Sequence, residues 1–484
     1  MSHSENNAEA RADLNRTAMK AGLFYVISQL FVRGITFLTT PVFTRLLSKP
    51  QYSDYSRYES WLLIFAPIMS LCLWRSVERA KYDVRERFNE YCSSVQTLSY
   101  LSIGAFFLVF WTFRSFFAPL FSMTEFMLLV AFLYTFAHTS IFYFQRREKQ
   151  MMRYKASTAF SAATVIPAAL LAVAFVVWGK QTGREDQLVE LRILGHYTPM
   201  ILGGFFAAAL MAVQGRKLIQ IDYWKYALKF SLPLIPEVLS IQIMNQADKL
   251  MVIWLTGKEN GSVFAVATQV SFIIWIIEDS VWNAWLPWMY EKMAIGEEDG
   301  IENVWVILMH CFGLISLLLV MGAPEIILIL GGRKYTEAIW LIAPMVTGTL
   351  FRFYSYSYTA IQNYHKKTGF VAASTVSVMF LNVILNYLFI LLLGYRAAAY
   401  TTAFSYLVLL VVQALMEKRL TGRQIIPLVR TLRISFSWFA GCVCAMVLFL
   451  VPFPVRYAAA ALALAAAFVY VRPRLKTIRK SLGK

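Results

Sequence analysis

The sequence predicts an all-α integral membrane protein with about 14 transmembrane helices, and three observations lead to this fold class. Hydrophobic residues make up 58% of the 484 residues, charged residues only 15%, and the mean hydropathy is +0.55. Apolar runs of about 20 residues, the length that a helix needs to cross a bilayer, recur along the whole chain. Basic residues are concentrated in every second connection between these runs.

The predicted spans follow one another with short connections. The first 16 residues are polar and the apolar run behind them exceeds the length of a signal peptide, so we expect no cleaved signal. The spans are predicted at residues 18–43, 58–74, 95–113, 123–144, 156–178, 193–213, 226–255, 262–289, 304–330, 338–362, 369–393, 397–416, 434–451 and 455–471.

The basic connections predict the orientation in the membrane, with both termini in the cytoplasm. Segments 75–94, 145–155 and 417–433 carry five Lys and Arg residues each, and the tail 472–484 carries six. The net charge of +18 follows from this bias and favours contact with anionic membrane lipid. Nucleic-acid binding is disfavoured because the basic residues are spread over short loops.

A weak internal similarity predicts two halves. The segment LLSKPQYSDYSRYESW (46–61) follows the first span as WLTGKENGSVFAVATQ (254–269) follows the seventh, at an offset of 208 residues. We therefore expect two six-helix lobes, 18–213 and 226–416. The other predicted segments are a cytoplasmic N-terminal segment 1–17, a cytoplasmic linker 214–225, a basic cytoplasmic loop 417–433, two extra transmembrane helices 434–471 and a basic cytoplasmic tail 472–484.

The motifs of common enzyme classes do not occur in the sequence. We find no GxxxxGK[ST], HExxH or GxSxG motif, and neither the five histidines nor the five cysteines have metal-ligand or disulfide spacing. The longest predicted exterior segment, 179–192, is short for a membrane glycosyltransferase or polymerase. We therefore expect a transporter, not an enzyme, with no cofactor and with coupling to a proton or sodium gradient.

Ionisable side chains inside the predicted spans indicate a polar cargo path. Each costs about 2.5 to 3.5 kcal/mol in a bilayer, so helices that served only as anchors would not keep them. A scaffold without transport activity is disfavoured for the same reason. These residues are Arg33, Glu237, Asp248, Lys249, Glu278, Asp279 and Arg352.

Two spans carry a polar stripe along one helical face, with an arginine near the centre of each. The stripe of the first span consists of Tyr25, Gln29, Arg33, Thr36 and Thr40. The stripe of the tenth consists of Thr349, Arg352, Tyr356, Thr359 and Asn363. We interpret Gln29, Arg33, Arg352 and Tyr356 as substrate-binding candidates. The alternatives are arginines that snorkel to the interface and tyrosines that belong to an interfacial belt.

The seventh span supplies further candidates. Glu237 and Asp248 share one helical face, and Lys249 lies on the adjoining arc. We interpret Asp248 and Lys249 as substrate-binding residues, with capping of the outer end of the span as the alternative. Pro233 and Pro236 remove backbone donors, which membrane helices tolerate where a bend lines protein or a cavity.

The eighth and eleventh spans hold acidic and amide side chains. The adjacent carboxylates of Glu278 and Asp279, together with Glu237 of the seventh span, suit the coupling of transport to protons or sodium. The alternative for the adjacent pair is an internal ion pair, and Arg33, Arg352 and Lys249 are the cations considered. Asn382 and Asn386 share a face of the eleventh span and are expected to bond neighbouring helices.

Four segments give the chain a family resemblance. It resembles the polysaccharide and oligosaccharide-lipid flippases, O-antigen flippases among them, of the multidrug/oligosaccharidyl-lipid/polysaccharide (MOP) exporter superfamily. The segments that carry the resemblance are FVRGITFLTTPVFTRLLSKPQYSDY (31–55), FSLPLIPEVLSIQIMNQADKLMV (230–252), GSVFAVA (261–267) and ILGGRKYTEAIWLIAPM (329–345).

The resemblance implies a fold, a site and a cargo. The fold would have two six-helix lobes around a central cavity, with Arg33 and Arg352 lining that cavity from one lobe each. The cargo would be an undecaprenyl-pyrophosphate-linked oligosaccharide, moved by alternating access from the cytoplasmic to the outer leaflet of a bacterial inner membrane. Partners would be membrane lipid, a polysaccharide polymerase and glycosyltransferases. Many O-antigen flippases have 12 spans, so the last two helices predicted here depart from that pattern.

Two other functions remain open from the sequence. A cation-coupled multidrug exporter of the same superfamily would favour an acidic, aromatic cavity, which the two arginines argue against. A membrane glycosyltransferase or polymerase would need longer exterior loops than this chain has.

Overall fold

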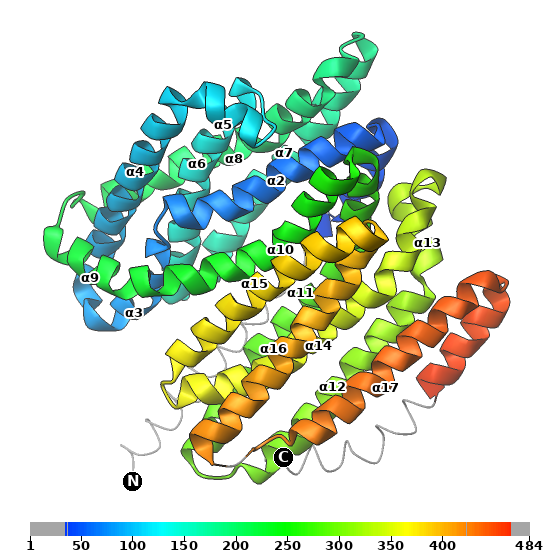
Figure 1. The fold of residues 1–484 in the computed structure, drawn as a ribbon. Helices are drawn as coiled ribbons and strands as arrows, with labels where there is room; N and C mark the ends of the chain where they lie inside the picture. Colours follow the sequence, from blue (N-terminus) through cyan, green and yellow to red (C-terminus); the bar gives the residue numbers. More distant parts are fainter. Residues whose placement is uncertain (1–33, 36, 423, 466–484) are drawn as a thin grey trace. The chain divides into compact units, whose positions relative to one another are not determined.

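The computed structural model describes residues 34–465 apart from residues 36 and 423, and this part of the chain is helical with no β-strand (Figure 1). The prediction of an all-α membrane protein is thereby confirmed. The described chain divides into two compact units, Met1–Gln242 and Ile243–Lys484. The division lies within α10 (Ile235–Thr256), the second half of the predicted seventh span.

Unit 1 is built mainly from long helices. They are α2 (Lys49–Met69), α3 (Ser76–Asp83), α4 (Phe88–Thr112), α5 (Arg114–Leu120), α6 (Glu125–Gln150), α7 (Tyr154–Gln181), α8 (Leu188–Gly215) and α9 (Ile221–Ser231). Helix α8 packs against α6 and α7. Small residues allow this approach, since a Cβ added at Gly204 would lie 2.4 Å from the Cα of Ala137 in α6.

Unit 2 contains the remaining helices. They are α10, α11 (Lys258–Ala294), α12 (Asp299–Met321), α13 (Ala323–Gly331), α14 (Ile339–Tyr364), α15 (Thr368–Leu393), α16 (Ala397–Thr421), α17 (Leu428–Val447) and a shorter apolar helix Phe453–Ala465 in the predicted last span. Helix α14 packs against both α11 and α16, and α15 packs against α16. Gly348 of α14 permits the close contact with α16, because an added Cβ would lie 3.1 Å from the Cα of Ala403.

Ten helices of the described chain are long and apolar enough to cross a membrane. The number rises to 11 if the bent pair Lys49–Met69 and Leu73–Asp83 forms one span. The predicted count of 14 is therefore not reached within residues 34–465. Most of the predicted span 18–43 lies outside the described residues, and the predicted span 338–362 forms α14, which is not among the ten.

Two predicted spans contain a break in the regular α-helix, and a sharp bend follows a third. Ser231 ends α9 and a 3-10 turn Leu232–Leu234 precedes α10, because Pro233 and Pro236 cannot donate backbone hydrogen bonds. The predicted span 304–330 is divided into α12 and α13 at Gly322, two residues before Pro324. After α2 the chain bends by 68° into a second helical segment, so part of the predicted loop 75–94 is helical.

Candidate functional site

Five helices of unit 2 bring polar and charged side chains into the protein interior. They are α10, α11, α14, α15 and α16, which carry residues separated by more than 150 positions in the sequence. The surrounding core is apolar and includes Met244, Phe351, Val378 and Leu409. In such surroundings a polar group is stable only when it is hydrogen-bonded or paired, so its partners indicate its role.

Asp248 is the centre of a hydrogen-bond network in this interior. Its side chain belongs to α10 and the residue is 8% exposed. The carboxylate accepts a hydrogen bond from Asn386 Nδ2 of α15 at 2.5 Å and another from Thr402 Oγ1 of α16 at 2.6 Å. Hydrogen bonds to an ionised carboxylate are roughly twice as strong as those between neutral groups. The three helices are therefore joined at one buried acidic residue.

A second layer of polar side chains supports this carboxylate. Asn382 Nδ2 donates to Thr402 Oγ1 at 2.9 Å, and Asn386 Nδ2 also lies 3.3 Å from Asn382 Oδ1. The hydroxyl of Thr401 donates to Asn386 Oδ1. The prediction that the two asparagines bond neighbouring helices is confirmed. The threonines were not singled out from the sequence, although the TTAFSY segment that begins at Thr401 is a polar interruption of an apolar run.

The chemistry of this network suits a hard cation. The Asp248 carboxylate and the hydroxyl oxygens of Thr401 and Thr402 belong to this network, whereas Asn386 faces the carboxylate with its amide nitrogen. Oxygen ligands favour hard cations over zinc or copper. The described residues hold no group of three or more His, Cys, Asp or Glu side chains placed to bind a metal. The arrangement thus offers a single negative charge, which a proton or one monovalent cation would balance.

Arg352 and Glu278 form a buried ion pair. The guanidinium Nη2 of Arg352 in α14 lies 3.1 Å from Glu278 Oε2 in α11, and the two side chains are 15% and 1% exposed. Glu278 Oε1 and Arg352 Nε are buried and have no hydrogen-bond partner in the part of the chain that the structure describes. The sequence left an ion pair between these residues open as an alternative, and the structure contains it. Each partner retains unused hydrogen-bonding capacity.

Two tyrosines, Tyr356 and Tyr406, lie near the Arg352 guanidinium. Its Cζ lies 5.8 Å from the ring centroid of Tyr406 in α16, and the Tyr406 hydroxyl donates to Asn245 Oδ1 of α10 at 3.3 Å. Tyr406 thus connects the ion pair to the helix that carries Asp248. Tyr356, one turn beyond Arg352, packs against Trp282 with ring centroids 5.1 Å apart.

The other predicted site residues have different positions. Lys249 is 8% exposed, next to Asp248 in α10, while Glu237 and Asp279 are partly buried. Arg33 and Gln29 lie outside the described residues. Two of the nine site residues predicted from the sequence, Arg352 and Glu278, are in direct contact in the structure.

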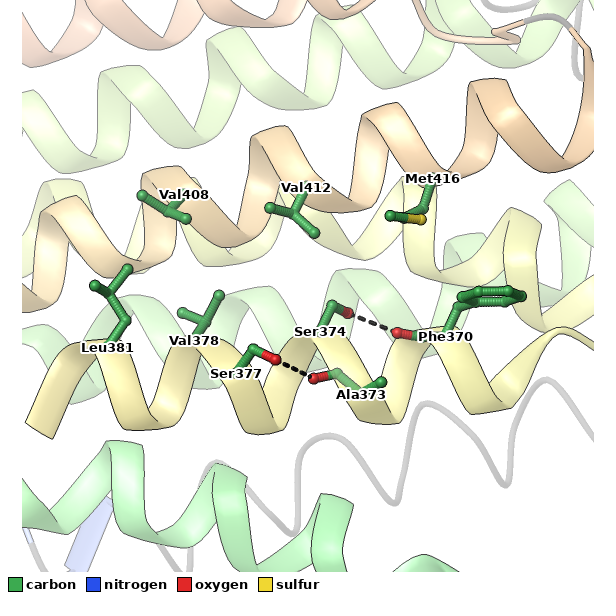
Figure 2. Close-up of a pocket in the computed structure, with 9 residues that line it drawn as sticks. All are labelled: Phe370, Ala373, Ser374, Ser377, Val378, Leu381, Val408, Val412 and Met416. Atoms are coloured by element: carbon green, nitrogen blue, oxygen red, sulfur yellow. Dashed lines mark hydrogen bonds between the residues drawn. The ribbon is translucent and has the colours of Figure 1, made fainter.

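An apolar hollow lies between α15 and α16, as Figure 2 shows. Its volume is about 340 Å³, and its lining includes Phe370, Leu381, Val408 and Met416. The hydroxyl of Ser374, which also lines it, accepts a hydrogen bond from Gln413 Nε2 at 2.8 Å. The lining contains no charged side chain, so this hollow suits hydrocarbon and not phosphate.

Comparisons with known proteins place this geometry in context. A family model described as "Polysaccharide biosynthesis protein" matches residues 18–293. The chain is 23% identical over 380 residues to Lsg locus putative protein 1 of Haemophilus influenzae, which covers 76% of this chain and 84% of the relative.

Solved structures show which fold this is. The chain is similar to lipid II flippase MurJ in an inward closed conformation, with a TM-score of 0.68, 14% identity and coverage of 94% of this chain and 100% of that one. It is also similar to an inward-facing multidrug resistance MATE family transporter of the MOP superfamily, with a TM-score of 0.62, 12% identity and coverage of 82% and 98%. At these identities the likeness shows the fold, which is that of MOP transporters.

Proposed function

The chain belongs to the polysaccharide biosynthesis protein family and has the fold of MOP transporters, and from this premise we propose that it is a flippase for a lipid-linked oligosaccharide. The cargo is an undecaprenyl-pyrophosphate-linked repeat unit, moved by alternating access from the cytoplasmic to the outer leaflet of a bacterial inner membrane. Both termini lie in the cytoplasm. A polymerase and glycosyltransferases that use and make the oligosaccharide are its partners.

The buried guanidinium of Arg352 is the observation that carries this proposal. It lies near the middle of the 26-residue helix α14 and is 15% exposed. A guanidinium stays charged at this depth and presents paired N–H donors that match two phosphate oxygens. The polyprenyl tail of the cargo can remain in lipid, so only the pyrophosphate and the sugars need a polar path.

The ion pair with Glu278 offers a way to couple transport to protons. A pyrophosphate that binds Arg352 displaces the Glu278 carboxylate from its cation. A buried carboxylate without a partner is costly, and protonation removes that cost. Binding of cargo at Arg352 and uptake of a proton at Glu278 therefore favour each other. Asp279, the next residue, is the proposed acceptor in the same relay, and Glu237 is the third acidic residue assigned to it.

Sodium coupling would use the Asp248 network instead. Its side chains come from three helices, so a cation bound at the Asp248 carboxylate would act where α10, α15 and α16 meet. Flipping driven by a proton gradient and by a sodium gradient, measured with Asp248→Asn and Glu278→Gln side by side, separates proton coupling from sodium coupling. Proton coupling predicts loss in Glu278→Gln and sodium coupling predicts loss in Asp248→Asn.

The test of cargo binding compares Arg352→Lys and Arg352→Ala with wild type. A lysine keeps the charge and loses the paired donors, whereas an alanine loses both, so binding should fall in the order Arg, Lys, Ala. The loss of a charged hydrogen bond is worth about 1.5 to 3 kcal/mol, or about ten-fold to over a hundred-fold in Kd. The measurement is binding and flipping of the lipid-linked oligosaccharide by purified variants.

A matched control removes an arginine elsewhere in unit 2. Arg396 is 49% exposed and lies 3.8 Å from Glu337, so Arg396→Ala should leave cargo binding unchanged. Wild-type affinity in Arg352→Ala would remove Arg352 from the site and direct attention to Lys249. Arg33→Ala belongs in the same experiment, because the proposal places Arg33 with Arg352 at the pyrophosphate.

A multidrug exporter is the second candidate, favoured by the buried carboxylate of Asp248 and by the MATE-like fold. It predicts that expression protects pump-deficient cells from cationic drugs. It also predicts that Arg352→Ala leaves this protection intact, whereas a flippase gives no protection at all.

A further inference from the structure

Unit 1 contains a buried arginine whose guanidinium lies between aromatic rings. Arg192, in the first turns of α8, is 8% exposed. Its Cζ lies 3.4 Å from the ring centroid of Tyr55 and 3.8 Å from that of Phe43, with Tyr52 at 5.4 Å. Stacked rings cover the faces of a planar guanidinium, whereas its N–H donors point outward from its edge. The rings therefore hold the charge in place without using the Nε and Nη1 donors.

The hydrogen-bond donors of Arg192 distinguish it from the other buried arginines. Arg57 lies 2.7 Å from Asp54, Arg147 lies 2.6 Å from Glu148, and the guanidinium of Arg456 pairs with Glu325. Arg192 makes no such pair within the described residues, and its Nε and Nη1 are buried without a hydrogen-bond partner there.

An unsatisfied buried cation of this kind is costly. Burial of a charged donor without an acceptor costs more than the about 1 to 3 kcal/mol of a neutral group. A ligand that supplies acceptor oxygens would remove that cost.

The walls of this site are suited to a sugar phosphate. Tyr55 packs edge-on against His196 with ring centroids 6.4 Å apart, and Tyr58 packs against Tyr197 at 5.6 Å. Tyr134 of α6 completes the cluster at 4.5 Å from Tyr197. Rings that carry polar edges pack against sugar rings, and an arginine binds the oxyanion attached to them.

Glu59 is the acidic residue near these tyrosines. It lies one turn beyond Tyr55 in α2 and is partly buried. It makes no ion pair with Arg192 in the described chain, so it does not use the guanidinium donors. The guanidinium edge is therefore where acceptor oxygens of a ligand would meet Arg192.

The position of Arg192 in unit 1 indicates the step of transport at which the site would act. Arg192 lies four residues, about 6 Å, from the beginning of α8 at Leu188. The preceding connection is tied to α2, because Gln51 Nε2 donates to the carbonyl oxygen of Glu185 at 2.8 Å. The basic-loop pattern predicts that this connection lies outside the cell. The site is therefore near the end of the path that the proposed flippase would use for release.

We propose that Arg192 and the rings of Phe43, Tyr52 and Tyr55 form a second oxyanion site, which holds a phosphate of the cargo near the outer surface. Its role in release rests on the proposed function and on the predicted orientation. The binding of an oxyanion at Arg192 depends on neither of these, and it can be measured without transport. The same chemistry would accept the phosphate of a membrane lipid.

The test uses the full chain in phosphatidylcholine nanodiscs, with inorganic pyrophosphate as the probe and calorimetry as the measurement. Arg352→Gln weakens the site of the proposed function, whose other arginine is Arg33, and the binding that remains is tested for its dependence on Arg192. Adding Arg192→Gln should weaken this remaining binding at least about ten-fold. Equal affinity in the single and double variants would overturn the inference and leave the proposed function untouched.

Control variants distinguish binding by the guanidinium edge of Arg192 from general effects of positive charge and of folding. Arg114→Gln removes an exposed arginine of unit 1 that pairs with Glu125, and it should leave pyrophosphate binding unchanged. If Arg192→Gln does not fold, Arg192→Lys keeps the charge and loses the planar edge. Full affinity in Arg192→Lys contradicts the proposal, and weakened affinity supports it.

A competition experiment with an anionic lipid identifies whether the phosphate comes from the cargo or from a lipid headgroup. Phosphatidylglycerol in the nanodiscs should compete with pyrophosphate in the Arg352→Gln variant if a lipid headgroup occupies the site. A site reserved for the cargo predicts no competition by the lipid. Absence of any binding of pyrophosphate and of any stabilisation by phosphatidylglycerol would overturn the inference.

Discussion

Removing one partner of the Arg352–Glu278 pair is expected to destabilise unit 2 more than removing both. The two side chains lie 3.1 Å apart and are 15% and 1% exposed, so either one alone would be a buried charge without a counter-ion. Breaking a buried pair from one side costs about 3 to 5 kcal/mol, whereas replacing both partners with apolar residues is nearly neutral or stabilising. The partial exposure of Arg352 favours the lower end of that range.

The perturbation is a set of three variants: Arg352→Met, Glu278→Leu and the double variant. A loss of about 3 kcal/mol, at about 2 to 4 °C per kcal/mol for a domain of this size, lowers Tm by about 6 to 12 °C in each single variant. The double variant should regain most of that loss. Thermal unfolding in nanodiscs, followed by circular dichroism, measures the three shifts.

Flipping activity gives the second readout of the same variants. Arg352→Met and the double variant should be inactive if Arg352 binds the cargo, and the stable double variant then shows that inactivity does not come from misfolding. Single variants as stable as wild type would refute the argument that the pair is buried and coupled. Full activity in the double variant would refute its role in transport.

Three further predictions concern coupling, the acidic network and topology. Glu278→Gln combined with Asp279→Asn should abolish gradient-driven flipping while cargo binding stays measurable, and full transport would leave the pair only a structural role. Asn386→Leu removes a donor to Asp248 and should cost about 1.5 to 3 kcal/mol by thermal unfolding, while an unchanged Tm would show that the Asp248 network adds little. Reporter fusions at residue 185 should face outside, and a cytoplasmic signal there would overturn the predicted orientation. Fusions expected in the cytoplasm are at residues 85, 150, 420 and 480.

The sequence alone predicted the membrane class and the helices, because the length and apolar character of a span are local properties. It also identified Asp248, Glu278 and Arg352 as charges inside spans, since a charge in an apolar run is visible without any knowledge of contacts. Its continuous span 304–330 was wrong, because α12 ends at Met321 and α13 begins at Ala323, next to Pro324. Hydropathy alone does not detect a lost backbone donor.

Tertiary packing decided which of these side chains meet. Glu278 and Arg352 are 74 residues apart, and Asp248 and Thr402 are 154 apart. Helical periodicity places a residue on a face, but the rotation and neighbours of that helix depend on contacts between distant segments. Arg192 was missed because it adjoins the boundary of a predicted span, where an arginine is ordinary. Only the folded chain shows that Tyr55 and Phe43 enclose its guanidinium and leave donors unpaired.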